Sequence, residues 1–225
     1  NIIANIAPKI VMNQLVGKRP FYRGYTKQIN SLVPSISAFQ IYIGLSIDLK
    51  IQYPNNYEFL INSSFNISSD YKNGLKNNML KAPCSVTIYS NIDNTCSPNT
   101  KSVMVVTVFA GYNYWKILSR SDYLHRKNIF ANSLLKRTQK IVKFKLSDIE
   151  SISVATPLTM ERYTGNPSGA IYGSEQSSFQ AGYRRTDFKS PIKNLYFVGA
   201  WTRPGGGITG VMLSGATLAK KLLTH

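Results

Sequence analysis

The chain has 225 residues, of which 43% are hydrophobic and 12% aromatic. It is long and apolar enough to bury a core, which excludes a disordered or low-complexity chain. The formal net charge of +17, from 27 Lys and Arg against 10 Asp and Glu, favours contact with polyanions such as nucleic acid or an anionic membrane surface. Alternatively, the charge reflects only a general bias in composition, because Lys, Asn, Ile and Ser are frequent throughout the chain.

Cysteines and histidines are too few and too scattered for metal or hydrolytic chemistry. Cys84 and Cys96 form no CxxC pair, and neither His125 nor His225 lies in a nucleophile motif. We therefore expect no metal ion and a reducing compartment, the cytoplasm. No apolar run reaches the length of about 18 residues needed to span a bilayer, so a membrane contact would be peripheral.

The N-terminal part is expected to start with a short apolar strand and a helix. Pro8 opens this helix over residues 9–16, and Gly17 ends it. A basic stretch with turn-forming residues follows over residues 18–25. The clearest pattern comes next, where apolar and mostly polar residues alternate and predict a strand with one buried face, formed by Phe39, Ile41, Ile43, Leu45, Ile47 and Leu49.

The middle of the chain predicts a sheet and a long basic helix. Further strands are expected at residues 57–61, 85–90, 103–109 and 149–155, with a helix near 69–80. Ser121 is expected to cap a long helix whose apolar face contains Leu124, Phe130, Leu134 and Ile141. Residues 116–145 contain nine Lys or Arg and one acid, which indicates a solvated face or, alternatively, a membrane-surface or anion-binding helix.

The C-terminal part predicts a short strand at 195–198, a glycine-rich turn at 199–210 and a helix at 211–223. A helix that starts after such a turn exposes backbone N–H groups, which suit a phosphate or an electron-rich flavin carbonyl. Gly205, Gly207 and Gly210 match the pattern GxGxxG. We reject the dinucleotide-binding meaning of this match, because no βαβ unit opens here and no acid follows Asp187.

Residues 194–210 (NLYFVGAWTRPGGGITG) resemble the closing motif of FAD enzymes of the amine-oxidase-like group, above all phytoene desaturase, carotenoid isomerase and retinol saturase-like proteins. Four other segments are similar to this family in the same order along the chain: 3–8 (IANIAP), 35–39 (SISAF), 155–163 (ATPLTMERY) and 169–173 (GAIYG). The resemblance therefore covers nearly the whole chain and is most specific at its C-terminal part.

The resemblance implies an α/β (α+β) fold. Residues 1–17 and 155–225 would form the C-terminal part of an FAD/NAD(P)-binding Rossmann-like domain, and residues 18–154 an inserted mixed β-sheet substrate domain. FAD would be held by backbone at Gly199, Ala200, Gly206, Gly207, Ile208 and Gly210. Many relatives carry an acid where Ala200 stands, so a contact with the ribityl chain is lost here. Trp201 would pack near the isoalloxazine ring or serve as a packing aromatic.

The implied function is an FAD-dependent oxidoreductase acting on CH–CH bonds of a lipophilic polyene, such as a carotenoid or retinoid, by desaturation, saturation or isomerisation. Glu161, Arg162 and Tyr172 are candidates for the cofactor–substrate junction; a surface ion pair and a core tyrosine are the alternatives. The N-terminal half that holds the ADP part of FAD in this family is missing from the sequence. We therefore expect a fragment, a split subunit or a degraded gene, and a chain that is inactive alone.

The alternative function is a non-enzymatic basic module. Aromatic and basic residues are interleaved over 21–25 and 112–116, which is typical of nucleic-acid binding. No recognised nucleic-acid motif is present, so we expect no nucleic-acid partner. An accessory subunit at an anionic membrane surface is the other form of this alternative.

Overall fold

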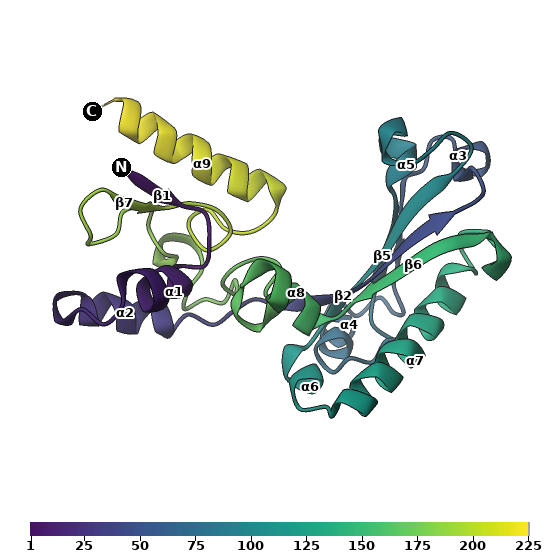
Figure 1. Ribbon diagram of the computed structural model, residues 1–225, viewed down its shortest axis with the longest axis horizontal. Coiled ribbons are helices and arrows are strands. Elements are labelled where there is room, and N and C mark those ends of the chain that lie inside the picture. The colour runs from purple at the N-terminus through teal and green to yellow at the C-terminus, as the bar shows by residue number, and fades with distance from the viewer. Residues whose placement is uncertain (225) are drawn as a thin grey trace. The chain divides into compact units, whose positions relative to one another are not determined.

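The computed structural model describes residues 1–224, which form two compact units (Figure 1). Unit 1 contains Asn1–Ile36 and Met160–His225, and unit 2 contains Ser37–Thr159. The mixture of helices and sheets confirms the expected fold class. The unit boundaries differ from the expected ones, which lay at 17/18 and 154/155. The assignment of the two units to cofactor and substrate stays a prediction.

Hydrogen bonds explain both boundary shifts. The backbone of residues 33–36 bonds to residues 171–175, with Ser35 N donating to Gly173 O at 2.8 Å and Glu175 N donating to Val33 O at 2.9 Å. These bonds hold residues 33–36 in unit 1. At the other boundary, the Thr156 hydroxyl lies 3.1 Å from the Tyr123 hydroxyl, which keeps the residues after the last strand in unit 2.

Unit 2 is built on a five-stranded antiparallel sheet of order β3-β4-β5-β2-β6. Its strands are β2 (Ser37–Leu45), β3 (Glu58–Ile61), β4 (Cys84–Ile88), β5 (Ser102–Ala110) and β6 (Ile149–Ala155). Helices α4 (Ile67–Leu75), α6 (Tyr112–Lys116) and α7 (Arg120–Thr138) lie on one face of it (Figure 1). All the strand pairings in this sheet are antiparallel, whereas a mixed sheet was expected.

The alternating residues of β2 form the centre of the core, as their period predicts. Phe39, Ile41, Ile43 and Leu45 are buried, and Leu49 joins them beyond the end of the strand. The ring of Phe39 stacks on Trp115 of α6, with 5.5 Å between centroids. The indole N–H of Trp115 donates to Asn77 Oδ1 at 2.9 Å, so its one polar atom is satisfied inside the core.

The long basic helix begins earlier than expected. Ser119, rather than Ser121, caps α7, because its hydroxyl accepts a hydrogen bond from Asp122 N at 3.2 Å. The apolar face is also narrower: Phe130 and Leu134 pack in the core, whereas Leu124 is exposed and Ile141 lies beyond the end of the helix. Most of the helix surface is therefore solvated.

Unit 1 contains a parallel pair of strands, β1 (Ile2–Ala4) and β7 (Leu195–Phe197), which come from opposite ends of the chain (Figure 1). Its helices are α1 (Pro8–Ile10), which continues into a π-helical segment (Val11–Val16), α2 (Arg23–Asn30) and α9 (Ile208–Leu223). The basic stretch expected as turns thus enters α2. Helix α8 (Pro157–Thr164) contains the boundary between the units.

The remaining short helices lie in connecting segments. They are α3 (Leu49–Gln52), α5 (Tyr89–Ile92) and the 3-10 turns Pro20–Tyr22, Asn94–Cys96, Leu146–Asp148, Pro167–Gly169 and Gly182–Arg184. No helix within residues 1–224 combines the length and the hydropathy needed to cross a membrane.

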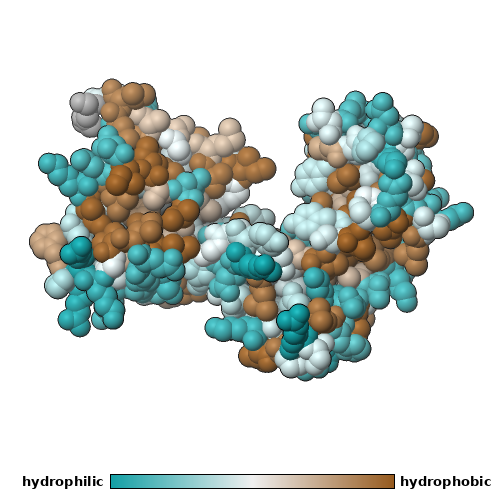
Figure 2. Space-filling model, viewed as in Figure 1, coloured by the Kyte–Doolittle hydropathy of each residue, from teal (hydrophilic) through white to brown (hydrophobic). Residues whose placement is uncertain are grey.

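Apolar side chains remain on the surface of unit 1. Ile208 and Met212 of α9 are 81% and 68% exposed, and Ile2 and Ile3 of β1 are also exposed. Figure 2 shows hydrophobic residues gathered on this side of the unit, over α9 and β1. A surface this apolar marks a contact with another element or molecule.

Candidate functional site

The segment between β7 and α9 is a turn whose backbone requires glycine. Gly199, Gly205 and Gly207 have φ values of 93°, 138° and 92°. Residues with a side chain avoid this left-handed region, because their Cβ atom clashes with the backbone, whereas glycine enters it freely. The strand, glycine turn and helix expected from the sequence are therefore present, and α9 begins at Ile208 rather than at Val211.

Two further glycines allow close packing within this turn. A Cβ atom on Gly206 would lie 2.5 Å from the carbonyl oxygen of Tyr172, and one on Gly210 would lie 2.6 Å from that of Gly205. Gly207 is different, since nothing lies within 4 Å of the position its Cβ would take. Gly206 and Gly210 thus pack backbone against backbone, while Gly207 faces open space where a ligand can approach.

The first turn of α9 offers free backbone donors beside that space. Gly207 is the N-cap and provides no side chain, and the intrahelical bonds begin with Val211 N donating to Gly207 O at 3.0 Å. The N–H groups that precede this bond have no partner inside the helix. Together with the positive end of the helix dipole, they favour a phosphate or an electron-rich ring carbonyl.

Ser214 ties α9 to the turn. Its hydroxyl accepts a hydrogen bond from Gly199 N at 3.0 Å and lies 2.8 Å from the hydroxyl of Thr202. Ser214 and Thr202 are both fully buried. These bonds fix the start of the turn against the second turn of the helix, so the position of Gly207 is set by the fold.

Arg185 organises the turn from inside, and the sequence did not reveal it. Its Nε donates to Thr202 O at 2.9 Å, and its Nη2 donates to Ser174 O at 3.1 Å, to Tyr172 O at 3.2 Å and to Ala200 O. We call these contacts the Arg185 network. Because its four acceptors come from two separate segments, Arg185 joins residues 172–174 to residues 200–202.

The Arg185 guanidinium carries a buried positive charge without a carboxylate partner. The residue is 2% exposed, and burial lowers its pKa. The two ion pairs within residues 1–224 join Lys101 to Glu150 and Arg203 to Asp187. Among these residues Nη1 has no hydrogen-bond partner. A Cβ on Gly205 would lie 3.4 Å from the Arg185 Cζ, so the charge lies directly against the glycine turn.

The three candidates for the junction with substrate lie in different environments. Glu161 Oε1 accepts a hydrogen bond from Ser168 N at 3.0 Å, which supports a local turn. Arg162 is exposed, with its Cζ 5.7 Å from the ring centroid of Tyr163. Tyr172 is 40% exposed and packs its backbone against Gly206. Of the three, the structure brings Tyr172 to the glycine turn.

Ala200 and Trp201 have structural contacts. The Ala200 carbonyl belongs to the Arg185 network. Trp201 is buried with Ala7 and Ala170, and its indole N–H donates to Asn166 Oδ1 at 3.0 Å. This environment suits the packing role that was the alternative for Trp201. Within residues 1–224, no group of three or more His, Cys, Asp or Glu could hold a metal ion.

Sequence comparisons identify relatives named as a retinol reductase and a carotenoid desaturase. The chain is 28% identical over 217 residues to all-trans-retinol 13,14-reductase of Danio rerio, covering 88% of this chain and 36% of that protein. It is 31% identical over 195 residues to 1-hydroxycarotenoid 3,4-desaturase of a Flavobacterium strain, covering 80% of this chain and 36% of that protein. The chain thus spans little more than a third of the length of these curated relatives.

Comparison of structures agrees on the fold. An oxidoreductase from Methanosarcina mazei superposes with a TM-score of 0.50 at 13% sequence identity, covering 97% of this chain and 42% of that one. A sequence model of the family described as flavin containing amine oxidoreductase matches residues 63–223. This match spans more than half of the chain and confirms the resemblance seen in its closing motif. The chain therefore belongs to the flavin-containing amine oxidoreductase family, whose cofactor is FAD.

Proposed function

We propose that this chain is the C-terminal part of an FAD-dependent oxidoreductase that acts on CH–CH bonds of a lipophilic polyene, by desaturation, saturation or isomerisation. The observation that carries the proposal is the open start of α9. Gly207 leaves a space free of protein atoms within 4 Å of its missing Cβ, and backbone donors of the first helical turn lie beside it. In a member of a flavin-dependent family, the flavin is the ligand expected to bind at this open helix start.

The residues of the turn fit a flavin. Gly206, Gly207 and Ile208 would hold the electron-rich edge of the ring system through their backbone, since no side chain covers Gly207. The buried charge of Arg185 would favour electron density on that ring from behind the turn. The bound flavin supplies the hydride chemistry, and this chain supplies orientation and electrostatics.

The relatives support a polyene substrate. Their names give a retinol as the substrate of one enzyme and a hydroxycarotenoid as the substrate of another. On the open face of the unit 2 sheet, the Tyr42 hydroxyl donates to Gln40 Oε1 at 2.6 Å and Gln40 Nε2 donates to Thr107 Oγ1 at 3.0 Å. Because these polar groups satisfy one another, the face offers aromatic and aliphatic surface to an apolar ligand.

The exposed apolar surface of unit 1 supports the proposal that a preceding segment completes it. A pair of parallel strands is too small to be stable alone, and parallel sheets are normally covered by helices on both faces. The exposed residues of β1 and α9 are the surface that further strands and helices would cover. That preceding segment would also hold the ADP part of FAD.

The test uses the complete gene product. We expect a purified protein with the absorbance of bound flavin, and we expect it to convert a retinol or a carotenoid when product is followed by liquid chromatography and mass spectrometry. A product that loses hydrogen, gains hydrogen or keeps its mass separates desaturation, saturation and isomerisation. A colourless protein contradicts the flavin site, whereas a yellow protein that leaves every polyene unchanged contradicts only the substrate.

A further inference from the structure

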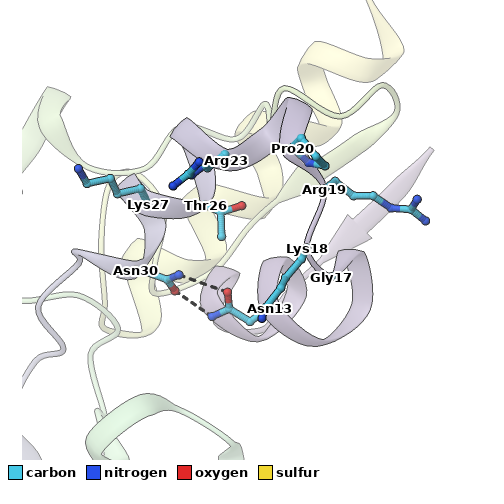
Figure 3. A pocket seen from close by; sticks show the side chains of 9 residues that line it. All are labelled: Asn13, Gly17, Lys18, Arg19, Pro20, Arg23, Thr26, Lys27 and Asn30. Carbon is cyan, nitrogen blue, oxygen red and sulfur yellow. Dashed lines mark hydrogen bonds between the residues drawn. The ribbon is translucent and has the colours of Figure 1, made fainter.

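A pocket of about 730 Å³ opens in unit 1 between the π-helical segment Val11–Val16 and α2 (Figure 3). Sites for small organic ligands have volumes of about 300–1,000 Å³, so this one can hold more than a single inorganic ion. None of the glycine-turn residues lines it, so its occupant is separate from the flavin proposed above.

The pocket has charge of one sign. Its lining includes four cationic residues and no acidic one, the cations being Lys18, Arg19, Arg23 and Lys27. Residues 1–47 contain no Asp or Glu, and neither of the two ion pairs within residues 1–224 involves these cations. Like charges gathered around one hollow repel each other, so an anion bound there lowers their energy.

Two asparagines of the lining bond to each other. Asn13 and Asn30 exchange two amide hydrogen bonds, with Asn13 Nδ2 donating at 2.8 Å and Asn30 Nδ2 donating at 3.2 Å. This pair links the π-helical segment to α2. Figure 3 shows Thr26 pointing between the two segments, whereas the charged ends of Arg19 and Lys27 point outward on opposite sides. Long cationic side chains beside this polar pair can turn toward an anion that enters.

We propose that this pocket binds a phosphate group borne by an organic molecule. Phosphate matches the lining, because its oxygens accept both the forked donors of Arg and the point charge of Lys. The group could belong to a lipid headgroup or to a soluble phosphate ester. Phe21 is 87% exposed and follows the lining residue Pro20, and Leu15 is 72% exposed and lies two positions from Asn13 and from Gly17. Both side chains could enter a bilayer beside a bound headgroup.

The experiment compares two double variants of the complete gene product. Arg23→Gln with Lys27→Gln removes two charges from the pocket, and Arg126→Gln with Lys136→Gln removes the same charge from exposed positions of α7. Binding is measured by co-sedimentation with phosphatidylcholine vesicles, with and without phosphatidic acid, and by thermal shift with glycerol 3-phosphate. We expect the pocket variant to bind its phosphate probe roughly thirty-fold more weakly and the α7 variant to bind nearly as wild type.

Thr26→Phe tests the cavity itself, because it fills the space without changing the charge. We expect it to abolish binding while leaving the far-UV circular dichroism unchanged. Vesicle binding without a thermal shift by glycerol 3-phosphate assigns the site to a lipid, and a thermal shift without vesicle binding assigns it to a soluble ester. The proposal is overturned if wild type binds neither probe, if both double variants lose affinity equally, or if Thr26→Phe binds as wild type.

Discussion

Most buried apolar residues of unit 2 form one cluster that runs through the sheet and its helices, whereas unit 1 has two clusters of three buried side chains each. Met12, Ile29, Phe188 and Leu218 are buried in unit 1 outside these two clusters. The clusters of unit 1 are Ala7, Ala170 and Trp201, and Val11, Leu195 and Phe197. Unit 1 depends instead on hydrogen bonds, chiefly the Arg185 network, and on glycines that bring backbone segments together. Unit 2 has one large core, while unit 1 has small cores, a hydrogen-bonded glycine turn and an exposed apolar surface.

The largest expected effect follows from the Arg185 network. Arg185→Leu leaves four carbonyl oxygens, in two buried and two partly buried hydrogen bonds, without their donor, and we expect a loss of about 3–5 kcal/mol in the free energy of unfolding. Urea denaturation of the complete gene product measures it. The matched control is the exposed neighbour in Arg184→Leu, for which we expect less than about 1 kcal/mol. Equal losses in the two variants would show that the network does not hold unit 1.

The next largest loss of stability is expected in the core of unit 2. Ile41→Ala removes a fully buried side chain, and we expect it to cost about 2–5 kcal/mol. Met212→Ala, on the exposed face of α9, should change the stability of the 225-residue chain by no more than about 0.5 kcal/mol. In the complete gene product, the Met212 variant should cost clearly more, because the preceding segment would cover that face. An unchanged cost would argue that α9 stays uncovered.

Gly206→Ala tests the close packing of the turn. Its new methyl group would meet the Tyr172 carbonyl at 2.5 Å, so we expect a cost of about 1–3 kcal/mol together with weaker flavin retention. Gly215→Ala is the matched control on α9, where nothing lies within 4 Å of the added atom. This control should stabilise the helix by about 0.5–1 kcal/mol. Flavin absorbance after gel filtration and chemical denaturation measure both variants.

The smallest effect concerns a tyrosine in unit 1. Burial, with a further contribution from the Asp187 charge, raises the pKa of Tyr25 to about 12, and its hydroxyl has no partner among residues 1–224. We expect Tyr25→Phe to stabilise the protein at neutral pH by about 1 kcal/mol, since it removes an unsatisfied buried group. The exposed residue Tyr163 provides the control variant Tyr163→Phe, which should have no effect.

The same tyrosine sets a pH dependence. An unfolded chain releases the Tyr25 proton near pH 10, whereas the folded protein keeps it until about pH 12. The unfolded state therefore binds fewer protons in this interval, and the free energy of unfolding falls as the pH rises through it. Denaturation across this range should show a steeper alkaline loss for wild type than for Tyr25→Phe, and parallel curves would contradict the assignment.

The sheet of unit 2 could be predicted because its signal is local. Apolar residues at every second position fix which face of β2 is buried, whatever the strand pairs with. The boundary at residue 36 could not be predicted, since it depends on bonds from residues 33–36 to a segment more than 130 positions away. Ser119 and Ser121 could each cap a helix, and only the packed position of α7 decides between them.

The candidate site likewise has features that the sequence predicts and features that depend on the fold. A strand, a glycine turn and a helix are visible in the sequence, but the separate roles of the glycines depend on which backbone lies opposite each one. Gly206 meets Tyr172 and Gly207 meets open space, although the two are neighbours. Likewise Arg184 and Arg185 are alike in sequence, and only the fold buries the second.

A crystal structure of the complete gene product with FAD bound tests the central claim most directly, because that claim is a contact between the ring system and the start of α9. We predict the isoalloxazine edge within hydrogen-bonding distance of backbone nitrogens in residues 206–208, with Arg185 behind the turn. A structure in which protein side chains fill the space beside Gly207 and the flavin lies elsewhere would contradict it.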